Sequence, residues 1–194
     1  CRGLCLKLSE QERILVITFH HMISDGWSVG IFNKEFSVAY ESFAGFTSPN
    51  LPALPVQYAD YSMWQRSWLS GNVLEKQLSY WQEHLHDITT LELPTDRNRP
   101  SVQSYKGGFC RHYISKEKLE QLRQLSKDEG MTLFMVLFSI FSGVLSKLSH
   151  QNDVVIGTPI AGRNSSDIEG LIGFFVNTLA LRVNAGGNPK FKEL

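Results

Sequence analysis

The most constraining feature of this sequence is an apolar run that ends abruptly in a polar loop. Residues 14–19 (Ile-Leu-Val-Ile-Thr-Phe) are followed at once by residues 20–28 (His-His-Met-Ile-Ser-Asp-Gly-Trp-Ser). A short run of β-branched and apolar residues indicates a buried strand. Residues 4–8 alternate apolar and other side chains ahead of a polar turn at 9–12. We therefore expect an opening hairpin whose second strand is buried and leads into the histidine loop.

Helical and strand periodicities interleave along the rest of the chain. Apolar residues three or four apart indicate amphipathic helices, and proline and glycine clusters indicate loops. The uncharged stretch 130–146 is too short for a membrane span, which favours a buried core helix. The order predicts an α/β or α+β fold with at least one mixed sheet. Helices are expected over 28–43, around 61–68 and 74–85 with a break near Gly71, over 115–130 and over 131–148; strands over 109–114, 153–156 and 178–183; loops over 45–57, 94–108 and 157–170.

Composition excludes several classes of partner. The chain has 194 residues, with 19 Lys and Arg against 19 Asp and Glu, so its formal net charge is zero. No bulk charge draws it to nucleic acid or to an anionic membrane. Three cysteines with no CxxC spacing predict neither a disulfide framework nor a zinc site, and favour a cytoplasmic location. Because the chain starts at Cys1 rather than Met, and ends at 191–194 as if a helix were beginning, we expect a fragment.

The loop at 20–28 holds the candidate reactive groups. Neighbouring residues on a strand point to opposite faces, so only one of His20 and His21 is expected to face a given cavity. Gly26 leaves room for a ligand to pass. Three interpretations stay open: structural histidines at a strand end; a metal site of two His and Asp25, which lacks further ligands; and a histidine that serves as general base or hydrogen-bond partner in acyl transfer.

Three segments together point to a family. The histidine loop, residues 58–64 (Tyr-Ala-Asp-Tyr-Ser-Met-Trp) and residues 172–182 (Ile-Gly-Phe-Phe-Val-Asn-Thr-Leu-Ala-Leu-Arg) resemble, in this order, three core motifs of condensation domains from non-ribosomal peptide synthetases. Phe19 stands where the family has Met, and Ser62 where it has Ala. The likeness runs along the whole chain. The family's first two and last two motifs are not in this sequence, so the resemblance implies an internal fragment of one condensation domain.

The resemblance also implies a fold and a division of the chain. Condensation domains have a two-lobed fold similar to chloramphenicol acetyltransferase, with a tunnel between the lobes that passes the histidine motif. Residues 1–93 would be the end of the first lobe, and residues 94–194 the start of the second. In an alternative division the boundary between them lies as early as about residue 70.

The activity implied is peptide-bond formation. An upstream and a downstream peptidyl carrier protein, each with a phosphopantetheine arm, present a donor thioester and an acceptor amine, and an adenylation domain lies in the same synthetase. The resemblance makes His21 the catalytic residue, with His20, Asp25 and Gly26 supporting it and Asn177 as a tunnel-lining candidate. It implies no metal and no cofactor bound by the domain itself. Whether His21 acts as a base or only positions the amine stays open.

The remaining expectations are structural or concern rival functions. We expect Asp25 to pair with an arginine encoded ahead of Cys1; its alternative is a helix cap. The rival functions are an epimerisation domain, another HxxxDG acyltransferase, and a non-catalytic module of the kind that loses the second histidine. The isolated fragment is expected to be inactive. Tyr61, Trp64, Trp68 and Trp81 are expected to pack; His84, His86, His112 and His150 are expected at the surface; Arg163 and Arg182 are either tunnel or lobe contacts or exposed arginines.

Overall fold

The structure is a computed structural model that describes residues 1–193. The chain divides into two compact units: residues 1–80 with 158–179 form the first, and residues 81–157 with 180–194 form the second. The division of a complete domain into lobes near residue 93 stays a prediction. Leu194, the last residue of the segment expected to begin a helix, lies outside the described residues.

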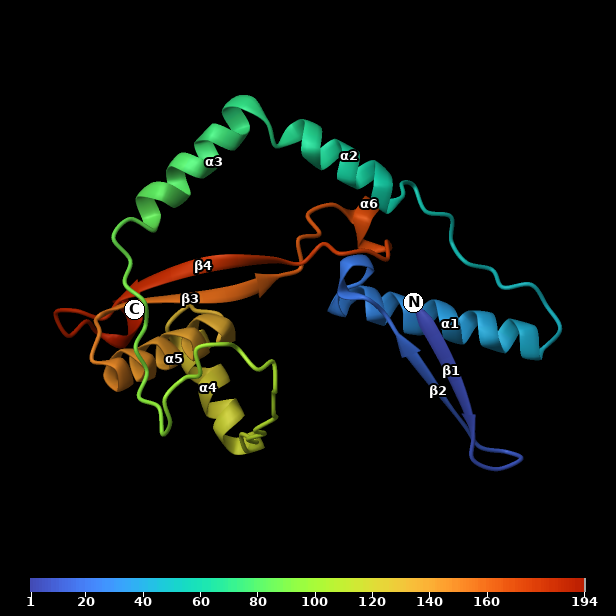
Figure 1. Cartoon of the computed structure of the whole chain (residues 1–194), viewed down its shortest axis with the longest axis horizontal. Helices are drawn as coiled ribbons and strands as arrows, with labels where there is room; N and C mark the ends of the chain where they lie inside the picture. Colours follow the sequence, from blue (N-terminus) through green and yellow to red (C-terminus); the bar gives the residue numbers. More distant parts are fainter. Residues whose placement is uncertain (194) are drawn as a thin grey trace. The chain divides into compact units, whose positions relative to one another are not determined.

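Helices and strands interleave along the chain, which confirms the expected mixed class (Figure 1). The strands pair as two separate sheets of two strands each, β1 with β2 and β3 with β4. A mixed sheet contains both a parallel and an antiparallel pair and so needs at least three strands. The described residues therefore do not form the expected mixed sheet. The elements are β1 (Arg2–Lys7), β2 (Arg13–Thr18), the 3-10 helix η1 (His21–Ile23), α1 (Gly26–Ala44), α2 (Tyr58–Trp68), α3 (Gly71–His84), α4 (Lys116–Asp128), α5 (Leu133–Ser149), β3 (Asp153–Ile160), α6 (Ser166–Glu169), β4 (Asn177–Asn184) and the 3-10 helix η2 (Phe191–Glu193).

The opening hairpin is confirmed, but its second strand is not buried. β1 and β2 pair antiparallel, with Arg2 opposite Thr18 and Lys7 opposite Arg13. The expectation of a buried second strand is wrong, since Leu15 and Val16 are 46% and 42% exposed. Among the described residues β2 pairs with β1 alone, and every residue of β2 except Ile17 is exposed. Just past the end of β2, the Phe19 ring packs against Phe32 of the helix that follows.

Helix α1 begins slightly earlier than expected and carries the predicted apolar face. Asp25 is its N-cap residue, and its carboxylate accepts from the Ser28 backbone N–H at 2.8 Å. This bond satisfies one of the free N–H groups of the first turn. The Phe32 ring meets Phe19 edge-on, with centroids 5.0 Å apart, and stacks on Phe36 at 5.7 Å. The helix is thereby packed against the residues that precede the histidine loop.

Helices α2 and α3 are separated at residues 69–70, as the sequence pattern indicates. Trp64 and Trp68, one turn apart on α2, stack with their ring centroids 5.5 Å apart. About half of each side chain is still exposed, and both border a cavity of about 740 Å³. Packing therefore accounts for only part of their surface.

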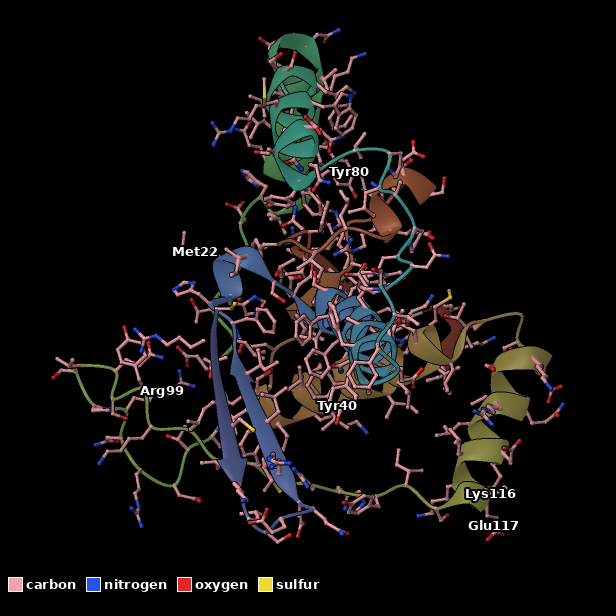
Figure 2. The ribbon with its side chains drawn as sticks, turned by 90° about the vertical axis from the view of Figure 1, so that its right-hand side faces the viewer. Met22, Tyr40, Tyr80, Arg99, Lys116 and Glu117 are labelled. Carbon is pink, nitrogen blue, oxygen red and sulfur yellow. The ribbon has the colours of Figure 1, made fainter. Side chains whose placement is uncertain are left out.

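In the second unit, the predicted helix over 115–130 is confirmed, and Ser115 caps α4 by accepting from the Lys118 N–H. The predicted strand over 109–114 is wrong: these residues form no regular element, and no described strand pairs with them. Ser115 and Lys116 thus follow an irregular, exposed segment, and Lys116 and Glu117 project from the start of α4 (Figure 2).

The core helix expected over 131–148 is present as α5, and one of its faces is buried while the other is exposed. Phe134 and Phe141 are about half exposed, because the described neighbours cover only the opposite side. Among the described residues, no single helix is long and apolar enough to cross a membrane, although the bent pair α4 and α5 passes that test jointly. The buried face of α5 consists of Val136, Ser139, Ser142, Leu145 and Ser146.

The expected loop over 157–170 is shorter than the pattern suggested. β3 continues to Ile160, and the short helix α6 covers four residues of the remainder. Strand β4 confirms the alternation expected over 178–183. Of the histidines expected at the surface, His86 and His112 are exposed, as is His150, while His84 is half-buried.

Arg182 on β4 ties three segments of the second unit together. Its Nε and Nη2 donate to the two carboxylate oxygens of Asp153, at 2.8 and 2.7 Å. Its Nη1 donates to the backbone carbonyls of His84 and His86, both at 2.9 Å. These bonds lower the pKa of the Asp153 carboxyl. The end of α3 is thus fixed to the β3–β4 sheet through one guanidinium.

We predict that Arg182→Lys destabilises the intact protein. One ammonium cannot reproduce a two-point carboxylate contact together with two carbonyl contacts. The free energy of unfolding, measured by chemical denaturation, should fall by more in this variant than in the matched control. Arg123→Lys is the matched control, because the Arg123–Glu120 pair is exposed and one turn apart on α4, and should cost less than about 0.5 kcal/mol. Equal losses in the two variants would contradict the role of Arg182.

Candidate active site around the paired histidines

The two histidines lie on the segment that joins β2 to α1. His20 is the N-cap residue of η1, and His21 is its first residue. Met22 marks this short helix at the end of the hairpin in Figure 2. Both histidines are exposed, whereas Ser24 and Asp25, which follow them, are buried. The loop therefore presents its imidazoles outward from a buried anchor.

The neighbouring histidines make opposite hydrogen bonds. The Met22 backbone N–H donates to His20 Nδ1 at 3.1 Å, so Nδ1 of His20 is an acceptor. His21 Nδ1 lies 2.8 Å from the carbonyl oxygen of Ser24. A carbonyl only accepts, so His21 Nδ1 carries a proton. In the neutral imidazole the lone pair of His21 is consequently on Nε2, whereas in His20 the proton is on Nε2. Of the two, only His21 offers an accepting Nε2.

The ring of Phe174 also contacts His21. The two ring centroids are 5.3 Å apart and the planes are perpendicular. The His21 imidazole is thus oriented by a hydrogen bond at Nδ1 and by an aromatic contact. The two histidines have different partners, but not through the expected alternation along a strand, because β2 ends at Thr18 and His21 begins the 3-10 helix η1.

Asp25 joins the histidine loop to a segment about 150 residues later. Besides the Ser28 N–H, its carboxylate accepts from the Phe175 N–H at 3.0 Å. Its Oδ1 lies 3.4 Å from Nη2 of Arg163, and the side chains of Asp25 and Arg163 are 3% and 1% exposed. Within the described residues the ion-pair partner of Asp25 is Arg163, a pairing not predicted from the sequence; an arginine encoded ahead of Cys1 stays a prediction. The alternative, a helix cap, is also realised, because one carboxylate has room for several donors.

Arg163 is held by acceptors on two sides. Its Nη1 donates to the carbonyls of Ile168 and Leu171, at 2.6 and 2.8 Å. Its guanidinium carbon lies 4.0 Å from the centroid of the Phe175 ring, a cation–π distance. Its Nε is buried without a hydrogen-bond partner among the described residues. Of the interpretations open for Arg163, the exposed arginine is excluded.

The electrostatics of Asp25 follow from these contacts. Burial by itself raises the pKa of a carboxyl. The N–H groups of Ser28 and Phe175, the Ser28 hydroxyl and the Arg163 charge outweigh burial and lower the pKa of Asp25 from 3.8 to about 2. Asp25 is therefore charged at neutral pH. Its buried carboxylate is occupied by these donors, and no hydrogen bond joins it to the imidazole of His21 among the described residues.

Sequence reasoning missed the importance of Ser28. It is fully buried, its hydroxyl lies 2.8 Å from both Asp25 Oδ1 and the Gly173 carbonyl, and it accepts from the Gly173 N–H at 3.0 Å. Arg163 Nη2 donates to the same oxygen at 3.0 Å. A signal was present, because Ser28 lies four residues before Phe32 and hence on the apolar face of the helix. A hydroxyl on that face needs buried partners.

The two remaining site candidates lie at element ends. Gly26 is the first residue of α1, and a Cβ built there meets nothing within 4 Å. Asn177 is exposed at the start of β4, where its Oδ1 accepts from the Thr178 N–H. No hydrogen bond joins Asn177 to His21 within residues 1–193. Room beside Gly26 is thus a fact of the structure, whereas a tunnel there stays a prediction.

The metal interpretation finds no ligand set. Among residues 1–193, no group of three or more His, Cys, Asp or Glu side chains is placed to hold a metal ion. In the histidine loop, Nδ1 of each histidine is engaged with a backbone group. The arrangement instead fits a histidine that accepts a hydrogen bond or a proton through Nε2.

Curated relatives match this chain from end to end. One of the linear gramicidin synthase proteins of Brevibacillus parabrevis is 47% identical over 194 residues, which is 100% of this chain and 4% of that protein. Malpinin synthetase of Mortierella alpina is 48% identical over the same span, which is 2% of its length. The chain thus spans only a small part of these relatives.

Solved structures give the same result for the fold. The X-domain from teicoplanin biosynthesis superposes with a TM-score of 0.89 at 26% identity, covering 99% of this chain and 44% of that one. This likeness confirms the expected chloramphenicol acetyltransferase-like fold, as part of a domain. The sequence profile of the condensation domain matches residues 2–194. The chain therefore belongs to the condensation domain family of non-ribosomal peptide synthetases.

Proposed function

We propose that this chain carries the catalytic histidine of a centre that joins a donor acyl thioester to an acceptor amine. The observation that carries the proposal is the orientation of His21, whose Nδ1 donates to the Ser24 carbonyl and whose Nε2 is left as an acceptor. An attacking amine has N–H groups to donate, so it is complementary to such a nitrogen. Family membership supplies the reaction class.

The proposed step forms a C–N bond and breaks a C–S bond. The amine nitrogen of the acceptor attacks the thioester carbonyl of the donor, and the donor's phosphopantetheine thiol leaves. The proton lost by the amine ends on that thiol. Nε2 of His21 serves either role that the sequence left open, taking the proton or orienting the amine, since both need its lone pair. Holding two tethered reactants together supplies a further part of the rate.

The other site residues have supporting roles in this proposal. His20 fixes η1 through its accepting Nδ1, and Asp25 anchors the loop by its contacts with Ser28, Phe175 and Arg163. Gly26 borders open space in which a tunnel would run. Asn177 stays a tunnel-lining candidate. Substrates arrive on the phosphopantetheine arms of an upstream and a downstream peptidyl carrier protein, and an adenylation domain belongs to the same synthetase.

The rival functions make different demands on the same imidazole. Epimerisation needs a second acid or base on the other side of the α-carbon, and another HxxxDG acyltransferase would accept a free acceptor. A non-catalytic module would not require the second histidine. The oriented Nε2 of His21 favours a catalytic role over the last of these. The products of one assay distinguish the other two.

We predict that His21→Ala removes most peptide-bond formation in the full-length synthetase while carrier loading stays normal. Loss of a positioned proton acceptor costs roughly 10²- to 10⁴-fold, read by mass spectrometry of dipeptidyl product on loaded carriers. His20→Asn is the matched control, because an amide oxygen can still accept from the Met22 N–H, and it should retain most activity. A His21→Ala rate above about a third of wild type would remove His21 from the mechanism. An inverted α-carbon without dipeptide would indicate epimerisation.

A pH-dependent contribution of Asp25 to stability is also predicted. Its pKa is lower in the folded than in the unfolded protein, so its contribution is full above pH 3.8 and is lost as pH falls toward 2. Asp25→Asn leaves Arg163 without its counter-charge and should cost roughly 3 kcal/mol at pH 7. The difference in free energy of unfolding between wild type and Asp25→Asn should decrease by about 2 kcal/mol as the pH falls from 4 to 2.

Denaturant titrations of the intact domain at several pH values measure this gap. Asp128→Asn is the control, since Asp128 is exposed and accepts from the Gln124 side chain one turn away; its small effect should not follow the same pH course. A gap for Asp25→Asn that is independent of pH over this range would contradict the depressed pKa.

The isolated 194 residues should form no peptide bond. The chain corresponds to 44% of the X-domain chain that it matches. Large apolar side chains such as Leu15 and Phe141 are half exposed in it, which is unfavourable for a free-standing domain. The test supplies both loaded carriers to the isolated chain and to the full synthetase in parallel. Carrier-dependent product from the chain alone would show that it is an independent catalytic unit.

A further inference from the structure

Phe174 is a half-exposed aromatic residue between two buried ones. It is 41% exposed, whereas Gly173 and Phe175 on either side are buried. An exposed phenylalanine is ordinary by itself. Phe174 differs because its ring contacts His21, at a centroid distance of 5.3 Å and with perpendicular planes.

The backbone on both sides of Phe174 is held by the buried network around Asp25. The Gly173 N–H donates to the Ser28 hydroxyl and the Phe175 N–H to Asp25 Oδ2, each at 3.0 Å. The Tyr58 hydroxyl donates to the Phe174 carbonyl at 2.9 Å. These backbone contacts all lead to fixed partners, so the freedom left to Phe174 is that of its side-chain torsions.

Close packing reinforces this restraint. A Cβ added to Gly173 would lie 2.3 Å from the ring of Tyr58, so the two chains approach as closely as glycine allows. Phe175 packs on Tyr58 and Tyr61, with ring centroids 5.1 and 4.8 Å away. The Phe174 ring thus projects from a rigid support, which is the arrangement that makes a wall rather than a mobile side chain.

In the proposed function, the Phe174 ring lies beside the imidazole that holds the acceptor amine. In the function proposed above, the acceptor amine donates a hydrogen bond to Nε2 of His21. The α-carbon of the acceptor is covalently attached to the amine nitrogen. Because the Phe174 ring lies 5.3 Å from the centre of the same imidazole, a substituent on an amine held about 3 Å from Nε2 is within reach of that ring in the proposed function. A substituent larger than the available space would collide with a ring whose backbone is fixed.

We propose that Phe174 is a specificity-determining residue that limits the size of the acceptor's α-substituent. The inference rests on the proposed function, because it needs an amine at Nε2. Phe174→Ala removes most of the wall and Phe174→Trp enlarges it, while Gly173 and Phe175 keep their backbone bonds. Ser28 and Asp25 are untouched in both variants.

The test uses the full-length synthetase with a fixed donor and with acceptor carriers loaded chemically with glycine, leucine or tryptophan. The quantity measured is the ratio of kcat/KM for tryptophan to that for glycine. Phe174→Ala should raise this ratio at least about tenfold and Phe174→Trp should lower it, the range typical of size selection in an apolar pocket. Phe109→Ala is the control, because Phe109 is 97% exposed and lies outside the first unit.

The outcomes separate the two proposals. Wild type that makes no dipeptide with any acceptor overturns the proposed function, and the specificity role with it. Wild-type activity with unchanged ratios in both Phe174 variants overturns the specificity role alone, as does an equal loss for all acceptors. Histidine-labelled protein gives a readout without turnover: the His21 ring proton should lose its ring-current shift in Phe174→Ala. A His21 signal at an unchanged position would show that the contact is absent.

Discussion

The charge of Asp25 is the constraint on which the described site depends. A buried carboxylate is costly unless its lone pairs find donors. Here the donors come from the first turn of α1, from the segment after α6 and from Arg163. The hydrogen bonds that the Asp25 carboxylate accepts fix the start of the helix that follows the histidine loop. They also fix the segment that carries Phe174.

The network also explains how the site combines rigidity with access. The side chains that form the network, those of Asp25, Ser28 and Arg163, are buried. Next to the network, the rings of His21 and Phe174 are exposed. Interactions among the buried groups therefore maintain the geometry, while the two rings stay accessible. In the proposed function the buried groups would support the site and the exposed rings would meet the substrate, as in pre-organised centres that avoid reorganisation during reaction.

Local structure was largely predictable because its causes are local. The hairpin follows from alternation ahead of a polar turn, and α4 from the Ser115 cap and its leucines. Burial was less predictable: β2 has the pattern of a core strand yet is exposed, because burial depends on what covers a face. The prediction for 109–114 failed for a related reason, since a strand needs a partner to bond with, and none of the described strands pairs with this segment.

Consecutive residues were enough to identify the family, to locate the histidine pair and to name the two roles open to Asp25, an ion pair with an arginine or a helix cap, because such motifs and caps are local patterns. The folded chain was needed to show which arginine lies beside Asp25, why Ser28 is buried, which nitrogen of His21 is free and which ring lies next to it. Each of these depends on groups more than 130 residues apart or on hydrogen bonds whose direction requires coordinates. A buried charge is paired with groups that are close to it in space, and sequence order does not show which groups those are.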